Sequence, residues 1–175
     1  MTDTRGGVET EFEAIVAHHQ DGLYAFAVAL TRDPRQAEDA VQDAFVRAYS
    51  ALKRYDPERR RDLALRPWLY RITLNVIRNR ARRPRREVLL AQVPEQVDPG
   101  RGPETELLRR DDARRLLGAL GQLPEAQRAA VVLRYVRDLS YFEIAEVLGQ
   151  PVGSAKSNVH RGVAALRRDF LQEVS

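Results

Sequence analysis

Apolar residues in the first part of the chain recur at intervals of three and four positions, the spacing of one face of an α-helix. The first such stripe consists of Phe12, Ile15, Val16, His19, Leu23, Phe26 and Leu30. Thr10 and Glu13 have the spacing of a capping box, so we expect the first helix to begin near Thr10. No alternating pattern of a strand interrupts this segment, which we therefore predict to be helical throughout.

A second helix is predicted to open at Asp33, because Asp is a favoured N-cap and Pro34 suits the first turn. Its apolar stripe is almost unbroken and contains Ala37, Ala40, Val41, Ala44, Phe45, Ala48, Tyr49 and Leu52. A third helix is expected from about Trp68, with a buried side formed by Leu69, Ile72, Thr73, Val76 and Ile77. Its opposite face carries Arg71, Asn75, Arg78 and Arg82, at steps of 4, 3 and 4 residues.

Helical periodicity is lost between Pro84 and Pro103, a segment that contains four prolines and two glycines. We expect residues 84–103 to be a flexible linker, because this composition disfavours a packed helix or strand. The linker would separate one domain over residues 1–83 from another over residues 104–175. The predicted fold class is therefore all-α, with two small helical domains.

The second domain ends in a pattern typical of a helix-turn-helix. Ser140 and Glu143 form a second capping-box pair, and the short helix that they open is predicted to stop at Gly149. A longer helix then runs from about Val152 to Phe170. Earlier apolar positions are expected to anchor this module: Leu107, Leu108, Leu116, Leu117, Leu120, Ala129, Ala130, Leu133 and Val136.

The last helix has a polar surface suited to DNA. Its buried stripe contains Val152, Ala155, Val159, Val163 and Leu166. The remaining positions of its first half, Ser154, Lys156, Ser157, His160 and Arg161, are predicted to face the major groove. Similar helix pairs also occur in bundles that never touch DNA, and Lys156 and His160 are equally compatible with an ordinary solvated surface.

Charge and composition narrow the function further. The formal net charge is +4. Residues 61–90 contain 9 basic and 2 acidic side chains, whereas residues 1–60 contain 8 basic and 11 acidic side chains. This basic segment is either a site for a polyanion or a solvated face. The absence of cysteine excludes disulfides and thiolate metal sites. With neither a signal peptide nor an apolar stretch of about 20 residues, we expect a cytoplasmic protein without cofactor or metal.

Four stretches resemble the extracytoplasmic-function (ECF) group of sigma-70 factors. LPEAQRAAVVLRYV and LSYFEIAEVLGQPVGSAKSNVHRG resemble region 4, which reads promoters, whereas AEDAVQDAFVRAY and RPWLYRITLNVIRNRARR resemble region 2. The resemblance implies an alternative sigma factor that binds core RNA polymerase and directs promoter-specific initiation. Members of the family are commonly held inactive by an anti-sigma factor, so we expect such a partner as well.

The resemblance also assigns roles to residues. Asp39, Gln42 and Asp43 would dock on polymerase. Contacts to the unpaired minus-10 strand would come from Trp68, Arg71, Asn75, Arg78, Asn79 and Arg82, with Trp68 either stacking on a base or anchoring its loop. The residues implied for minus-35 recognition are Ser154, Lys156, Ser157, His160 and Arg161. No residue is assigned a catalytic role.

The last helix departs from the family pattern at Ser154 and Ala155, where Thr and Val are usual, and at three further positions. Asn158 and Val163 stand where basic residues are common, so we expect fewer phosphate contacts or an altered preference at the minus-35 element. Gly162 lies in mid-helix, at a cost of roughly 1 kcal/mol relative to Ala, and it allows close approach either of DNA or of another helix.

Two other functions remain open at this point. A regulator that binds an operator through the helix-turn-helix would have the same second domain. An enzyme acting on nucleic acid is less compatible, because the chain has three scattered histidines and no Gly-rich phosphate loop.

Overall fold

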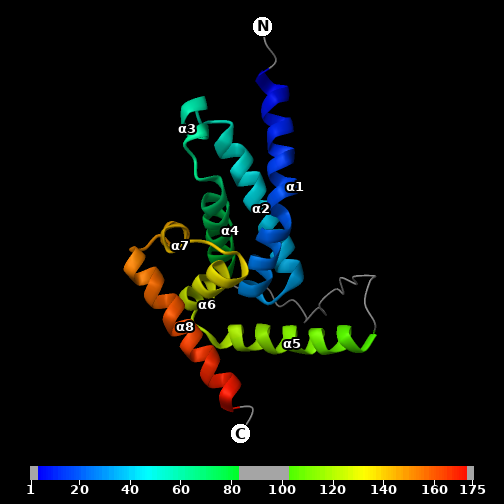
Figure 1. The fold of residues 1–175 in the computed structure, drawn as a ribbon. Helices are drawn as coiled ribbons and strands as arrows, with labels where there is room; N and C mark the ends of the chain where they lie inside the picture. The colour runs from blue at the N-terminus through cyan, green and yellow to red at the C-terminus, as the bar shows by residue number, and fades with distance from the viewer. Residues whose placement is uncertain (1–3, 83–102, 173–175) are drawn as a thin grey trace.

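The structure, a computed structural model, describes residues 4–82 and 103–172, with side chains described for residues 9–82 and 113–169. The elements are α1 (Thr4–Thr31), α2 (Pro34–Leu52), α3 (Pro57–Arg61), α4 (Leu65–Ala81), α5 (Pro103–Gln122), α6 (Glu125–Val131), the π-helix η1 (Val132–Val136), α7 (Tyr141–Leu148) and α8 (Val152–Gln172) (Figure 1). These ranges hold no strand, which confirms the all-α fold class. The expected linker lies outside the described residues, apart from Pro103 at the start of α5.

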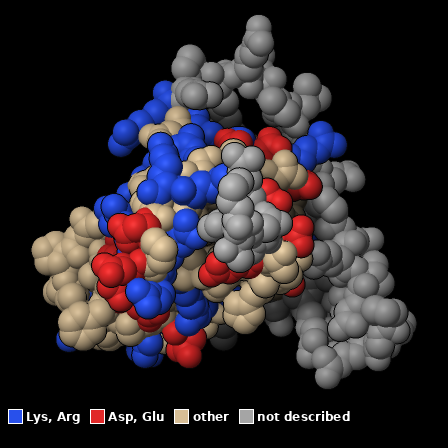
Figure 2. All heavy atoms as spheres, turned by 90° about the horizontal axis from the view of Figure 1, so that it is seen from above, with Lys and Arg blue, Asp and Glu red and all other residues tan. Residues whose placement is uncertain are grey.

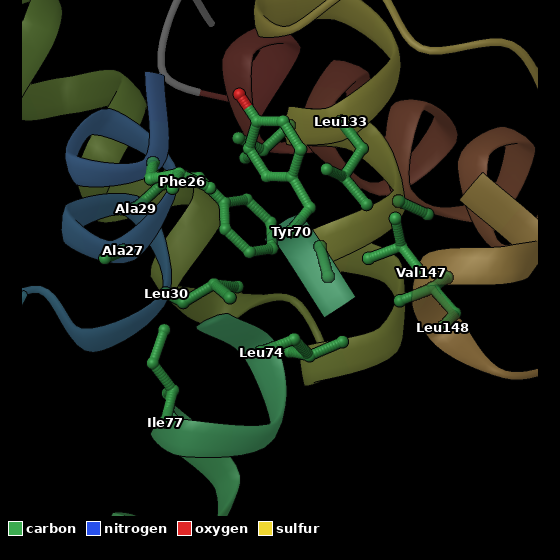
Figure 3. Close-up of a cluster of buried hydrophobic side chains, with 14 of the residues drawn as sticks. Phe26, Ala27, Ala29, Leu30, Tyr70, Leu74, Ile77, Leu133, Val147 and Leu148 are labelled. Atoms are coloured by element: carbon green, nitrogen blue, oxygen red, sulfur yellow. The ribbon is translucent and has the colours of Figure 1, made fainter. Parts of the chain in front are cut away.

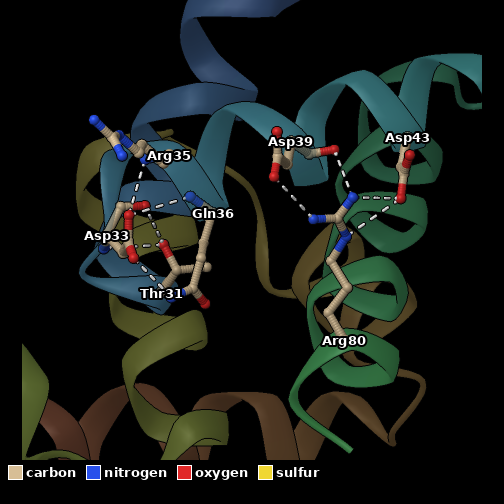
Figure 4. Close-up of polar contacts among 7 residues, drawn as sticks. All are labelled: Thr31, Asp33, Arg35, Gln36, Asp39, Asp43 and Arg80. Atoms are coloured by element: carbon tan, nitrogen blue, oxygen red, sulfur yellow. Dashed lines mark hydrogen bonds and ion pairs between the residues drawn. The ribbon is translucent and has the colours of Figure 1, made fainter. Parts of the chain in front are cut away.

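Local sequence signals place several helix ends correctly. The Asp33 carboxylate caps α2 by accepting hydrogen bonds from the backbone N–H groups of Arg35, at 2.9 Å, and Gln36, at 3.2 Å (Figure 4). At α7 both bonds of the capping box between Ser140 and Glu143 are present. Gly149 then ends α7 with a φ of +65°, in the left-handed region that glycine adopts without strain.

Two helix starts differ from prediction. α1 begins at Thr4, so the expected start at Thr10 is wrong; Gly6 and Gly7 weaken the helical signal upstream of it. α4 begins at Leu65 rather than Trp68. The Arg-rich stretch before α4 contains the additional short helix α3, which Asp56 caps by accepting a hydrogen bond from the backbone of Arg59 at 2.7 Å.

Two predicted core positions lie at the surface. Leu116 is 41% exposed and Val136 is 51% exposed. Val136 ends the π-helix η1, whose wider turns change the direction of its side chains relative to a continuing α-helix. A pattern based on 3.6 residues per turn therefore fails for Val136.

Buried side chains of the two modules form one continuous hydrophobic cluster. In Figure 3, Tyr70 and Leu74 of α4 lie between α1, which contributes Phe26 and Leu30, and the helices of the second module. On the far side the cluster continues through Leu133, Val147 and Leu148. The Phe26 and Tyr70 rings meet edge to face, with centroids 5.2 Å apart.

Two arginines of the second module donate hydrogen bonds to the first module beside this hydrophobic cluster. Arg137 donates from Nε to the Tyr70 hydroxyl at 2.8 Å, and Arg128 donates from Nη1 to the carbonyl oxygen of Leu30 at 2.9 Å. A Cβ at Gly22 would collide with the Arg137 guanidinium, so glycine at this position makes room for that side chain. Burial lowers the pKa of Arg128, the nearby Arg32 lowers it further and Glu125 raises it.

None of the described helices is sufficiently long and apolar to cross a membrane.

Candidate nucleic-acid and partner interfaces

The polar face of α4 lies largely in solvent, as its spacing predicts. Arg71, Asn75, Asn79 and Arg82 are exposed. Arg78 is half-buried, because its Nε donates to the Glu125 carboxylate of α6 at 2.7 Å. The second module therefore already occupies one member of the predicted strand-binding set.

Trp68 belongs to a small aromatic and cationic stack at the start of α4. Its ring is half-buried against the core and lies 6.1 Å from the ring of Tyr55. The guanidinium of Arg59 in α3 lies 4.0 Å from the centroid of the same Tyr55 ring. These ring contacts link the start of α4 to Tyr55, which lies just before α3, and through it to Arg59 of α3. Sequence reasoning missed Tyr55 and Arg59, although an aromatic residue beside an Arg-rich stretch was a signal for them.

Asp39, Gln42 and Asp43 share one face of α2, as their spacing predicts. Gln42 is exposed, and the side chains of Asp39 and Asp43 are 64% and 47% exposed. The structure adds Arg80 of α4 to this group (Figure 4). Its Nη2 donates to Asp43 Oδ2 at 2.7 Å and to the backbone oxygen of Asp39 at 3.2 Å, and its Nη1 lies 3.5 Å from Asp39 Oδ2.

The bridging role of Arg80 was missed because Arg80 lies off the face traced by Arg71, Asn75, Arg78 and Arg82. Beside it is a hollow of about 280 Å³ lined by Asp43, Arg47, Val76, Asn79 and Arg80. The hollow connects the acidic face of α2 with Asn79 on the polar face of α4. These two candidate interfaces are therefore neighbours across α4.

Helices α7 and α8 have the order and turn of a helix-turn-helix. All five predicted contact residues, Ser154, Lys156, Ser157, His160 and Arg161, are exposed, whereas Ala155 and Val159 between them are buried. The Lys156 ammonium lies 5.6 Å from the centroid of the Tyr141 ring in α7. This interface is thus intact and accessible on the second module.

Two departures from the family pattern have structural explanations. Asn158 is 8% exposed, donates to Gln150 Oε1 at 3.3 Å and accepts from Arg161 Nη2 at 3.1 Å. Its side chain therefore faces the turn and Arg161 rather than solvent, and the expectation of fewer phosphate contacts or an altered preference at the minus-35 element stays a prediction. A Cβ at Gly162 would lie 2.6 Å from Val131 Cγ2, so this glycine allows α6, rather than DNA, to approach α8.

The surface charge is segregated. Figure 2 shows Lys and Arg side chains gathered in a band across one face of the molecule, with Asp and Glu in separate clusters beside it. In and around α3, Lys53, Arg54, Arg59 and Arg61 are exposed. A band of one sign next to clusters of the other suits a molecule that contacts both a polyanion and a basic partner.

Comparison with known proteins identifies both modules. Residues 15–87 match the family described as sigma-70 region 2, and residues 113–166 match sigma-70 region 4. The chain is 31% identical over 180 residues to the ECF RNA polymerase sigma factor SigW of Bacillus subtilis, covering 97% of this chain and 94% of that protein. The chain belongs to the ECF group of the sigma-70 family.

Further ECF relatives agree with this assignment. SigE of Mycolicibacterium smegmatis is 34% identical over 168 residues, and the match covers 94% of this chain and 63% of that longer protein. Two solved structures share the fold. CnrH, solved with the cytosolic domain of CnrY, has a TM-score of 0.70 and 29% identity, and the match covers 95% of this chain and 91% of that one. The sigma factor RpoE of Bartonella quintana, solved with the anti-sigma factor NepR, has a TM-score of 0.72 and 25% identity, and the match covers 90% of this chain and 95% of that one.

In this ECF sigma factor, region 2 contains the acidic face of α2 and the polar face of α4. Region 4 contains the helix-turn-helix of α7 and α8.

Proposed function

We propose that this chain is an alternative sigma factor that binds bacterial core RNA polymerase and directs promoter-specific transcription initiation. The observation that carries the proposal is the presence, in one chain and in the family's order, of a region 2 match and an exposed region 4 helix-turn-helix. It acts by binding, while polymerase performs the chemistry. Its place of action is the cytoplasm, where polymerase works.

In this proposal region 2 has two separate surfaces. Asp39, Gln42 and Asp43 dock on polymerase, because exposed carboxylates on a rigid helix complement a basic surface. The unpaired minus-10 strand is held by Trp68, Arg71, Asn75, Arg78, Asn79 and Arg82. The Asn75 amide can donate and accept, as a base edge requires, while arginines hold phosphates. Binding of unstacked bases offsets an opening cost of a few kcal/mol.

Region 4 reads the minus-35 duplex in this proposal. The first half of α8 enters the major groove and presents Ser154, Lys156, Ser157, His160 and Arg161. Arg161 is the strongest candidate for guanine, since a guanidinium can donate to both O6 and N7. Asn158 accepts a hydrogen bond from Arg161 Nη2 and so positions the guanidinium for its contact with DNA.

The predicted domain boundaries and the anti-sigma partner are part of the same proposal. Domains over residues 1–83 and 104–175, with a linker over residues 84–103, are supported in outline by two separate family matches, over residues 15–87 and 113–166, the first of which extends to residue 87. An anti-sigma factor is supported by the relative from Bartonella quintana, which was solved with one. An operator-binding regulator is not favoured, because it leaves the region 2 match unexplained.

In vitro transcription from a library of random promoter sequences tests the proposal. The purified chain with core polymerase is expected to yield transcripts from a subset that shares two sequence elements, whereas core polymerase alone yields none of that subset. Transcripts independent of the chain, or tight binding of the chain alone to duplex DNA without association with core polymerase, would support the regulator instead.

The docking face has its own test. Reversing two charges in Asp39→Arg with Asp43→Arg is expected to weaken assembly with core polymerase at least tenfold, because like charges then face the partner. Co-purification with core polymerase measures the effect, and an unchanged circular dichroism spectrum shows that the overall helix content is retained. Unchanged co-purification would rule out this face as the docking site.

A further inference from the structure

Arg80 joins the two proposed surfaces of region 2. It projects from α4 and contacts the side chains of both Asp39 and Asp43, with its shortest bond, 2.7 Å, to Asp43 Oδ2 (Figure 4). Both of those carboxylates belong to the proposed polymerase-docking face. In the free chain, therefore, the docking carboxylates already hold a cation that the chain itself supplies.

This internal ion pair is exposed enough to exchange. The Arg80 side chain is 37% exposed, and its partners Asp39 and Asp43 are 64% and 47% exposed. Ion pairs in such surroundings are weak, because water and salt screen both charges. A basic group on polymerase that approaches Asp43 competes with Arg80 for the same Oδ2 atom, and a small change in free energy is sufficient to displace it.

An open hollow next to Arg80 can accommodate its side chain after displacement. The hollow of about 280 Å³ next to Arg80 reaches Asn79, a member of the proposed strand-binding face on the same helix. No backbone movement is needed for a long side chain to turn across this space, since rotation about its χ angles is sufficient. There the guanidinium would face the phosphates of the captured strand.

We propose that Arg80 couples polymerase docking to strand capture: it occupies the docking carboxylates in the free chain and, once polymerase displaces it, binds a phosphate of the minus-10 strand. This inference rests on the proposed function. It explains why the acidic face and the basic face share one helix. It also gives Arg80 opposite effects on the two binding steps, which a purely structural role would not produce.

The first arm of the test measures docking with the full-length chain. Arg80→Ala is expected to bind core polymerase about two- to fivefold more tightly, the range for loss of a competing exposed ion pair. Arg80→Gln, which keeps much of the length without the charge, is expected to do the same. The matched control is Arg82→Ala, two residues further along the chain and exposed, which is expected to leave docking unchanged.

The second arm measures DNA binding by the assembled holoenzyme, with a fork-junction fragment of a promoter selected from the random library. The slope of log affinity against log salt is expected to fall by about 0.7 for Arg80→Ala, the value for one single-strand phosphate. Arg82→Ala is expected to reduce the slope similarly. Arg80→Lys, which keeps the charge, is expected to retain most of the salt dependence of the unaltered chain.

The outcomes separate clearly. Tighter docking together with the reduced slope supports the coupling. Weaker or unchanged docking by Arg80→Ala shows that Arg80 orients the carboxylates rather than competing for them, and overturns the inference. An unchanged slope removes the second half of the coupling and overturns it as well. Failure of the unaltered chain to bind core polymerase would instead refute the proposed function.

Discussion

Gly162 shows how one missing side chain sets the distance between two helices of region 4. Gly162→Ala is expected to destabilise the protein by about 1–3 kcal/mol, because its Cβ would lie 2.6 Å from Cγ2 of the buried, β-branched Val131. This penalty outweighs the roughly 1 kcal/mol that Ala gains in helix propensity. Urea denaturation measures the difference.

The control for this substitution lies in the same helix. Gly153→Ala places a Cβ with no neighbouring atom within 4 Å, so it is expected to be neutral or stabilising by up to about 1 kcal/mol. Equal effects of the two substitutions would show that packing against α6 is not what requires glycine at residue 162.

The proposed strand capture also depends on individual residues. Asn75→Ala combined with Arg78→Ala is expected to spare binding to core polymerase and to abolish promoter opening, because both side chains belong to the proposed strand-binding face. A permanganate footprint on a library-selected promoter measures opening, and co-purification with core polymerase is the control. Normal melting by the double variant would contradict the assignment of this face.

At the scale of the helices, end signals were the most informative feature of the sequence. The caps at Asp33, Ser140 and Gly149 were predicted correctly, because a cap depends on residues within one turn of itself, whereas the capping-box spacing of Thr10 and Glu13 did not mark the start of α1. The short α3 and the π-helix η1 were not predicted. A five-residue helix is too short to show a period, and a π-helix has a different one.

The cap of α2 carries a pH dependence. Burial raises the pKa of Asp33, but hydrogen bonds from Gln36 and Arg35 and the charge of Arg35 outweigh it, so the pKa is lower than the ordinary value. A lowered carboxyl pKa contributes stability that is complete above the ordinary value, about 3.9, and is lost as pH falls through the lowered one.

Asp33→Asn tests this dependence, since Asn can still cap but does not titrate. The stability difference between the original protein and the variant is expected to be largest above about pH 5 and to shrink as pH falls towards 2. Urea midpoints at a series of pH values measure it. A difference that stays constant with pH would show that the charge of Asp33 contributes nothing to the cap.

At the scale of the whole molecule, the two modules of the free chain are packed against each other. Arg78 already donates its Nε to Glu125, so a DNA phosphate can use that donor only if the modules separate on the polymerase. The apolar cluster around Tyr70 and Leu74 opposes separation more strongly than this exposed ion pair does.

Energy transfer between two dyes measures this separation. The chain has no cysteine, so Ser50→Cys with Arg167→Cys, both at exposed positions, labels one site in each module. Transfer is expected to fall when core polymerase is added, and to stay at the level of the free chain when Glu125→Arg is introduced without polymerase. Loss of transfer in the Glu125→Arg variant alone would mean that the ion pair, rather than the apolar cluster, holds the modules together.

The sequence by itself determined the helical class, the helix ends marked by Asp33, Ser140 and Gly149, and which faces are polar, because these depend on spacing and on residues within a turn of one another. Only the tertiary structure decided the partners of the polar residues. Arg80 reaches Asp43 across 37 positions, and Arg78 reaches Glu125 across 47. Asn158 and Gly162 likewise depend on packing against the turn and α6. A periodic pattern indicates which face of a helix a side chain lies on, but not which residues, distant in sequence, contact it in the folded chain.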